Sequence, residues 1–251
     1  MVRWNLFATR LDFLAICIAV SLVNVRCIAQ DKASGEPQAT TPQEPAVPAS
    51  INKDFLDPNL SVEDFIKRFE VESREVFANR AEIAKALELK PGMAVADIGS
   101  GTGAYLSTLT DLVGKEGRVY AVDVSPVFTK FLRKRVSQDG LVQVEVVLSD
   151  ADSTGLSPNS VDAVFVCDTY HHFEKPLATV QSIYHALKPN GLLVVVDFDR
   201  VPGKSREWVL QHVRAGKEDF RAEIEKAGLT FADEVKIDEL KETFILRFRK
   251  P

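Results

Sequence analysis

A glycine-rich segment, Asp97-Ile98-Gly99-Ser100-Gly101-Thr102-Gly103, follows an apolar run and precedes a helical pattern. Glycines at 99 and 101 leave the backbone open to a nucleoside or amino-acid ligand because they carry no side chain. The N–H groups at the start of the next helix attract a carboxylate or phosphate. Gly99, Gly101 and Ala104 also satisfy a relaxed dinucleotide fingerprint, so a nicotinamide-dependent dehydrogenase is an alternative.

An aspartate lies at the end of the second predicted strand, a position that suits nucleoside binding. Asp123 ends the run Val119–Val122 and lies 24 positions after Gly99. A carboxylate at the end of this strand can accept hydrogen bonds from both ribose hydroxyls. Asp123 therefore predicts a bound nucleoside without selecting a reaction.

Titratable side chains are dense in the segment Cys167-Asp168-Thr169-Tyr170-His171-His172-Phe173. Asp168, Tyr170, His171 and His172 are candidate catalytic residues, because imidazole titrates near neutral pH and can take a proton from a nucleophile. We expect one of the two histidines to act as this base. The alternative is that one histidine caps the next helix and the other packs, so that neither is catalytic. Cys167 ends an apolar run and is expected to be a small buried residue.

The histidine pair next to Asp168 also raises the question of a metal site. His185 and His212 stand alone in the sequence, and no second cluster has ligand spacing. The sequence therefore predicts no metal.

Apolar runs rich in β-branched residues alternate with helical patterns through most of the chain. Predicted strands cover 93–98, 118–122, 142–148, 161–167 and 192–198, and predicted helices cover 104–112, 126–136 and 176–187. Near-continuous apolar strands with helices between them indicate a mainly parallel sheet covered on both faces. A further helix at 218–227 precedes runs at 231–237 and 243–248, which are expected to form an antiparallel hairpin. Before the first strand, Ser61 and Asp64 have capping-box spacing for a short helix, and a second helix is expected over 74–89.

Further motifs relate the chain to a known superfamily. Asp150-Ala151 follows the third predicted strand, Ser160–Val164 begins the fourth, and Leu187-Lys188-Pro189-Asn190-Gly191-Leu192-Leu193 leads into the fifth. With the glycine loop and Asp123, these segments resemble the class I S-adenosylmethionine-dependent methyltransferases over roughly residues 72–250. The resemblance implies a doubly wound, Rossmann-like α/β fold with a mainly parallel seven-stranded sheet, helices on both faces and a C-terminal antiparallel hairpin.

The same resemblance implies S-adenosyl-L-methionine as cofactor and assigns residues to it. Gly99, Gly101 and Gly103 would line its methionine and ribose parts, and Asp123 would hold the ribose hydroxyls. At the adenine, Asp150 would accept from the exocyclic amine and Ala151 would offer its backbone N–H. Asp97 would order the loop or meet the cofactor's amino group. Arg74 or Glu75, in a segment that covers the pocket in many of these enzymes, would contact the methionine end or the substrate; exposed helix charges are an equal alternative for both.

The expected function is methyl transfer to a small molecule. The segment after the fourth strand lacks the paired prolines that nucleic-acid amine methyltransferases carry there. The net charge is −5 and no long basic run occurs, so a nucleic-acid partner is not expected. The alternatives are an exported, noncatalytic protein that binds S-adenosylmethionine or another nucleoside and, less favoured, the dehydrogenase.

The first residues have the pattern of an export signal. Arg3 and Arg10 precede the apolar stretch Phe13–Val25, and Cys27-Ile28-Ala29 suits cleavage after Ala29. The stretch is shorter than a membrane-spanning helix needs, so a permanent anchor is the alternative. We therefore predict a signal peptide over 1–29, a disordered Pro/Thr/Gln-rich linker over 30–58, a methyltransferase domain over 59–251 and a periplasmic or extracellular location.

Overall fold

A computed structural model describes residues 44–45, 47–48 and 50–251. The predicted signal peptide and the first part of the predicted linker lie outside the described residues. None of the described helices is long and apolar enough to cross a membrane.

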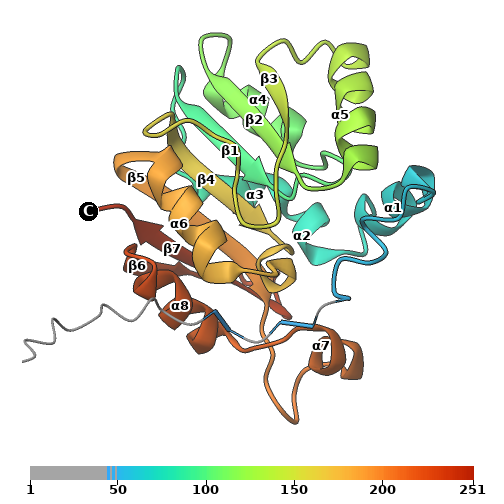
Figure 1. Cartoon of the computed structure of the whole chain (residues 1–251), viewed down its shortest axis with the longest axis vertical. Coiled ribbons are helices and arrows are strands. Elements are labelled where there is room, and N and C mark those ends of the chain that lie inside the picture. Colours follow the sequence, from blue (N-terminus) through green and yellow to red (C-terminus); the bar gives the residue numbers. More distant parts are fainter. Residues whose placement is uncertain (1–43, 46, 49) are drawn as a thin grey trace, which may run out of the picture. The chain divides into compact units, whose positions relative to one another are not determined.

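Seven strands form one sheet in the order β3-β2-β1-β4-β5-β7-β6 (Figure 1). Strands β1 to β5 pair in parallel, whereas β7 is antiparallel to both of its neighbours. This arrangement confirms the predicted doubly wound fold and its C-terminal hairpin. The strands are β1 (Ala94–Ile98), β2 (Arg118–Asp123), β3 (Val144–Leu148), β4 (Val161–Cys167), β5 (Leu187–Phe198), β6 (Thr230–Val235) and β7 (Thr243–Arg249).

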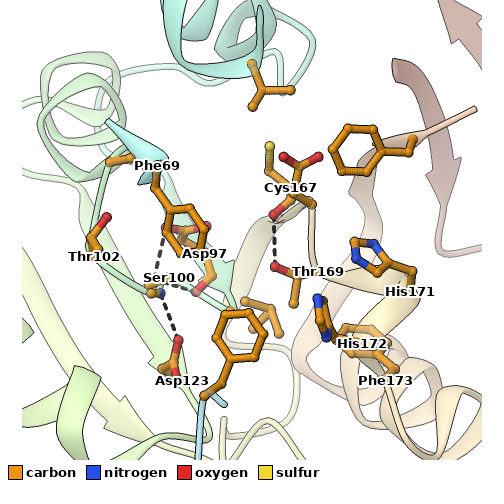
Figure 2. A pocket seen from close by; sticks show the side chains of 18 of the residues that line it. Phe69, Asp97, Ser100, Thr102, Asp123, Cys167, Thr169, His171, His172 and Phe173 are labelled. Carbon is orange, nitrogen blue, oxygen red and sulfur yellow. Dashed lines mark hydrogen bonds between the residues drawn. The ribbon is translucent and has the colours of Figure 1, made fainter. Parts of the chain in front are cut away.

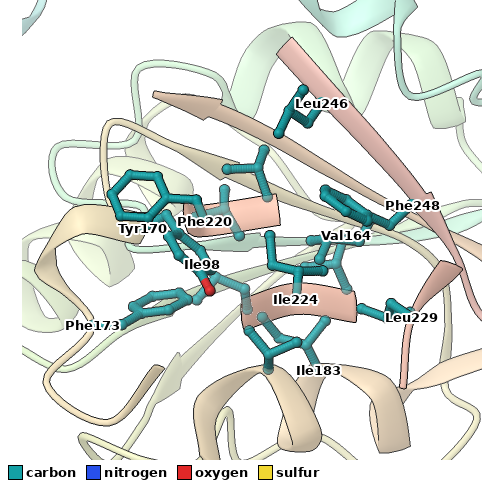
Figure 3. Close-up of a cluster of buried hydrophobic side chains, with 14 of the residues drawn as sticks. Ile98, Val164, Tyr170, Phe173, Ile183, Phe220, Ile224, Leu229, Leu246 and Phe248 are labelled. Atoms are coloured by element: carbon teal, nitrogen blue, oxygen red, sulfur yellow. The ribbon is translucent and has the colours of Figure 1, made fainter. Parts of the chain in front are cut away.

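Helices cover both faces of the sheet because its strands present apolar side chains in both directions. Along β4, Val164 and Val166 join one buried cluster, and Phe165 joins the other. The first cluster packs under α6 (Pro176–Ala186) and α8 (Lys217–Lys226), as Figure 3 shows for Ile183, Phe220 and Ile224. The second packs against α3 (Arg80–Lys85), α4 (Leu106–Val113) and α5 (Pro126–Gln138).

The helical region before β1 differs from the prediction. Helix α1 (Val62–Phe69) begins as expected, with the Ser61 hydroxyl accepting from the Asp64 N–H. The single helix expected over 74–89 is wrong, because α2 (Glu75–Ala78) and α3 are separated at Asn79. The Asn79 side chain and its backbone N–H both donate to the Glu75 carbonyl at 3.0 Å, and the Asn79 backbone departs from helical geometry, with φ −98° and ψ 16°.

Residues expected to belong to a free linker contact the domain. The Glu44 carboxylate accepts from the backbone N–H groups of Leu177 and Ala178 in the first turn of α6. Asn52 donates to the His172 carbonyl at 3.0 Å and to Glu174 at 2.9 Å. The structured region therefore begins before residue 59.

One helix has no counterpart among the sequence predictions. Helix α7 (Glu207–His212) lies between β5 and α8 and has only six residues. A helix this short offers little periodicity to detect. It nevertheless brings two side chains, Trp208 and His212, to the pocket described next.

Candidate active site

A pocket of about 900 Å³ opens at the carboxyl ends of β1, β2 and β4. Strands β1 and β4 are neighbours, but the chain leaves them toward opposite sides of the sheet. Such a switch point is where open α/β sheets bind ligands. Figure 2 shows one wall formed by the loop after β1 together with Asp123, and a facing wall formed by the segment after β4.

Two glycines of the loop after β1 line this pocket for different reasons. Gly99 has φ +75°, and a Cβ there would lie 2.2 Å from Cγ2 of Thr169, so only glycine fits where the β1 and β4 loops approach. Gly101 donates its N–H to Asp123 Oδ2 at 2.8 Å. A Cβ on Gly101 would meet no atom closer than 3.9 Å, so this position leaves free space beside the backbone.

Gly103 does not line the pocket and needs a different explanation. A Cβ at Gly103 would lie 2.9 Å from side-chain atoms of Leu106 and Leu132. These two leucines belong to α4 and α5. Gly103 thus permits helix packing, and its expected place beside a cofactor is corrected.

Asp97 and Asp123 are buried carboxyl groups on the wall that contains the loop after β1. Ser100 donates its hydroxyl to Asp97 Oδ2 at 2.9 Å, and the Ser125 N–H donates to Asp123 Oδ1 at 2.8 Å. Burial raises the pKa of Asp97 to about 7 and that of Asp123 to about 6. Titratable groups perturbed in this way cluster at functional sites.

Asp150 and Ala151 line the same pocket from the loop after β3. Both residues are exposed, and the Asp150 N–H donates to the Ser153 carbonyl at 3.1 Å. The Asp150 carboxylate is therefore available to an external donor. The structure brings this pair together with Gly99, Gly101 and Asp123, as the sequence predicted.

Two residues of α2 and its N-cap form part of the pocket wall. Arg74 pairs with Asp168, and its guanidinium lies 4.8 Å from the Phe69 ring centre. Glu75 accepts from the N–H groups of Lys241 and Glu242 at 2.7 and 3.0 Å, so it ties α2 to the loop before β7. Both residues line the pocket, which is the position expected for a cofactor cover.

The segment after β4 brings Asp168 to the opposite wall. Asp168 has φ +49°, and burial raises the pKa of its carboxyl despite the pairing with Arg74. Its Oδ1 is buried and has no hydrogen-bond partner among the described residues. Asp168 therefore remains a candidate for holding a donor group of a ligand.

Tyr170, which was expected beside Asp168, does not line the pocket. Its side chain is fully buried among Phe173 and Phe220, as Figure 3 shows. Its hydroxyl donates to Glu223 at 3.1 Å on α8. The short 3₁₀ turn of residues Tyr170–His172 directs Tyr170 into the core, so its catalytic assignment is corrected to a structural one.

The two histidines of that turn both line the pocket. His171 Nδ1 lies 2.7 Å from Asp197 Oδ1, and its backbone N–H donates to Asp197 Oδ2 at 3.1 Å. The Nε2 atom of His171 is buried without a hydrogen-bond partner among the described residues. Burial and the neighbouring His171 lower the pKa of His172 to about 2, so the His172 ring is neutral.

His212 does not stand alone in the folded chain. Its Nε2 lies 3.3 Å from Nε2 of His172, and its ring centre lies 5.2 Å from that of His171. Sequence reasoning also missed Asp197, whose only signal was an acidic residue inside the apolar strand β5. For His212 no sequence signal existed, because its position depends on how α7 folds back toward the turn after β4.

A seven-stranded sheet of this order, with a glycine loop and Asp123 at the switch point, is the arrangement found in class I S-adenosylmethionine-dependent methyltransferases, and the chain has this fold. The methyltransferase domain family matches residues 96–195. Members of this superfamily use S-adenosylmethionine as methyl donor.

Individual proteins show the same likeness. Among curated relatives, the ubiquinone/menaquinone biosynthesis C-methyltransferase UbiE of Hydrogenovibrio crunogenus is 28% identical over 114 residues, which is 45% of each chain. The match thus spans less than half the length of such relatives. A crystal structure of an S-adenosylmethionine-dependent methyltransferase from Aquifex aeolicus aligns with a TM-score of 0.67 and 26% identity, covering 76% of this chain and 99% of that one. The [4+2]-cyclase SpnF aligns with a TM-score of 0.66 at 18% identity, covering 83% and 98%.

Proposed function

We propose that this protein transfers a methyl group from S-adenosylmethionine to a small-molecule acceptor. The observation that carries the proposal is a single pocket with two different walls, the glycine loop with Asp123 and Asp150 on one side and the histidines after β4 on the other. Its volume of about 900 Å³ is at the upper end of ordinary ligand pockets, which leaves room for a cofactor and an acceptor together.

The cofactor side matches the chemistry of S-adenosylmethionine. The open backbone at Gly101 and the carboxylate of Asp123 suit a ribose, and Asp150 with Ala151 suits an adenine edge. In this proposal buried Asp97 meets the cofactor's ammonium group, whose positive charge would offset the cost of ionising that carboxyl. The bound cofactor supplies an electrophilic methyl group, and the residues around it provide alignment and exclude water.

The acceptor side suits a small molecule with an apolar or aromatic face. The Phe55 ring lies edge-on to His172 at 4.9 Å between ring centres, and Trp208 stacks on His212 at 4.7 Å. Of the two candidate bases, we propose that His171 assists removal of a proton from the acceptor as it is methylated and that Asp197 positions it, because the low pKa of His172 makes that ring a weak base. The relatives named for ubiquinone and menaquinone biosynthesis support testing aromatic acceptors first.

The competing proposal is that the protein binds its ligand without catalysis or that it catalyses a different reaction. The cyclase that shares this fold is named for another reaction, and fold alone does not establish chemistry. The dehydrogenase alternative is less favoured because Asp150-Ala151 and the Pro189-Asn190-Gly191 segment match the methyltransferase resemblance.

An activity screen decides between these proposals. The purified chain is incubated with S-adenosylmethionine and with hydroquinones, phenols, thiols and amines in turn, and S-adenosylhomocysteine is quantified. We expect at least one acceptor to give turnover that depends on the chain. Tight cofactor binding without product from any acceptor class would favour the noncatalytic role.

We also propose that the chain is exported and cleaved after Ala29. Arg3, Arg10 and the short apolar stretch before Cys27 support this, although these residues lie outside the described structure. N-terminal sequencing of the native protein should begin at Gln30. Recovery of Met1 on cytosolic protein would contradict export, and Met1 in the membrane fraction would indicate an anchor.

A further inference from the structure

Three of the four histidines of this chain meet at one place in the pocket. His171 and His172 come from the turn after β4, and His212 ends α7. One ring nitrogen from each residue lies within 4.8 Å of the other two. The fourth histidine, His185 on α6, is exposed and is not part of this histidine cluster.

His171 is held in the orientation that a metal ligand requires. Asp197 has no exposed surface and binds His171 Nδ1 at 2.7 Å, which leaves Nε2 as the free nitrogen. That Nε2 is buried and has no hydrogen-bond partner among the described residues, and a buried polar atom without a partner is costly. Histidines that bind metals commonly have their second nitrogen on a carboxylate in this way.

His172 and His212 have the spacing of two ligands that share one ion. Their Nε2 atoms are 3.3 Å apart. Two nitrogens bound tetrahedrally to one ion at about 2.0–2.1 Å stand roughly 3.3–3.4 Å from each other. Phe55 packs against the first ring and Trp208 stacks on the second, so both rings are held in place.

We propose that His171, His172 and His212 bind one divalent transition-metal ion of the Zn²⁺ type. All three residues line the pocket, so the fourth coordination position opens toward the acceptor side. Three protein nitrogens with one open position is the ligand arrangement of catalytic rather than structural zinc sites. Asp197 and Asp168 contribute negative charge near the histidine cluster, and Arg68 on the pocket wall opposes it.

This inference deepens the proposed function, on which its role in catalysis rests. An acceptor oxygen, nitrogen or sulfur that occupied the open position would be acidified by the ion. The histidines would then act together as ligands. The three positions should consequently be equally necessary for turnover, whereas a single free base would make only one of them necessary.

Metal binding is tested directly on the untagged full chain after removal of metals with a chelator. Co²⁺ is titrated first, because tetrahedral Co²⁺ gives strong visible absorption bands, and Zn²⁺ is then used to displace it. We expect one ion per chain. His212→Asn should weaken Zn²⁺ affinity by about 100-fold or more, and Asp197→Asn by about 10–100-fold.

His185→Asn is the matched control, since it removes an exposed histidine outside the cluster, and it should leave the affinity unchanged. Circular dichroism verifies that His212→Asn is folded. Absence of tetrahedral Co²⁺ bands in the wild-type chain, or equal affinities of the His185 and His212 variants, would overturn the metal site. Neither readout involves S-adenosylmethionine, so cofactor binding measured on the same sample shows whether the proposed function also fails.

Discussion

At the scale of single residues, the pocket contains two carboxyl groups whose pKa values are raised by burial toward neutral pH. Asp97 and Asp123 are 5% and 6% exposed, and the pKa of each is raised mainly by loss of solvent. A raised pKa means that ionising the carboxyl destabilises the folded state. The contribution of these two groups to the unfolding free energy is therefore greatest below about pH 4. It falls as the pH rises and is lost above about pH 6 to 7.

Asp97→Asn should remove the part of this pH dependence that comes from Asp97, because the amide has nearly the same shape and no charge; the part from Asp123 remains. We expect the cofactor-free variant to be more stable than the wild type at pH 8, by on the order of a few kcal/mol, and equally stable at pH 4. Urea unfolding at both pH values measures this difference. A constant difference between variant and wild type across the range would mean that Asp97 is not a buried titrating group.

The histidines lead to a kinetic prediction. His171→Asn should lower turnover by about 10²–10⁴ while cofactor affinity changes by no more than a few fold, because the ring lies on the acceptor side. His172→Asn and His212→Asn should show comparable losses if the cluster binds a metal ion. Full turnover in all three variants would make these residues structural, and lost cofactor binding would place them on the other side of the site.

Sequence reasoning located the residues whose positions depend on strand ends and missed those that depend on packing. Asp123 and Asp150 could be placed because the carboxyl ends of parallel strands meet at one edge. Tyr170 could not, because the direction of its side chain depends on a three-residue turn. His212 reaches the histidine cluster only through the fold of α7, for which the sequence carries no periodic signal.

At the scale of elements, periodicity predicted the sheet and its large helices well. The strands were evident from long apolar runs, whereas the separation of α2 from α3 at Asn79 does not interrupt the apolar spacing and could not be read from it. Strand β5 begins at Leu187, five residues before the predicted start, because a register shift after Val161 lets the segment join the sheet earlier. Such local irregularities depend on the partner strand and are not encoded in a residue pattern.

The close approach of the β1 and β4 loops gives a test at this scale. Gly99→Ala should lower the unfolding free energy by about 2–4 kcal/mol, because the new Cβ would overlap Thr169 in a backbone region unfavourable to alanine. Gly92→Ala is the control, since Gly92 also has positive φ but nothing lies within 4 Å of its Cβ position. That variant should lose only about 1–2 kcal/mol. Equal losses in urea unfolding would show that the loops do not restrict Gly99.

At the scale of the whole molecule, segments from both ends of the domain complete the pocket around the sheet. The N-terminal part supplies Asn52, Phe55 and Arg74, and the region after β5 supplies Trp208 and His212. The sheet positions the residues proposed to bind the cofactor, and these additions form the wall proposed to bind the acceptor. Acceptor choice therefore depends on the least regular parts of the chain, which explains why sequence patterns predict the cofactor more readily than the substrate.

We propose that this pocket binds S-adenosylmethionine through Asp123, and calorimetric titration of the purified chain with S-adenosylhomocysteine measures this binding. We predict one site, no binding of nicotinamide dinucleotides, and an affinity that falls about one to two decades in Asp123→Ala, because charge-assisted bonds to the ribose are lost. Asp111→Ala, at an exposed position of α4, should bind as the wild type does. No binding by the wild type, or equal affinity in the two variants, would contradict the account.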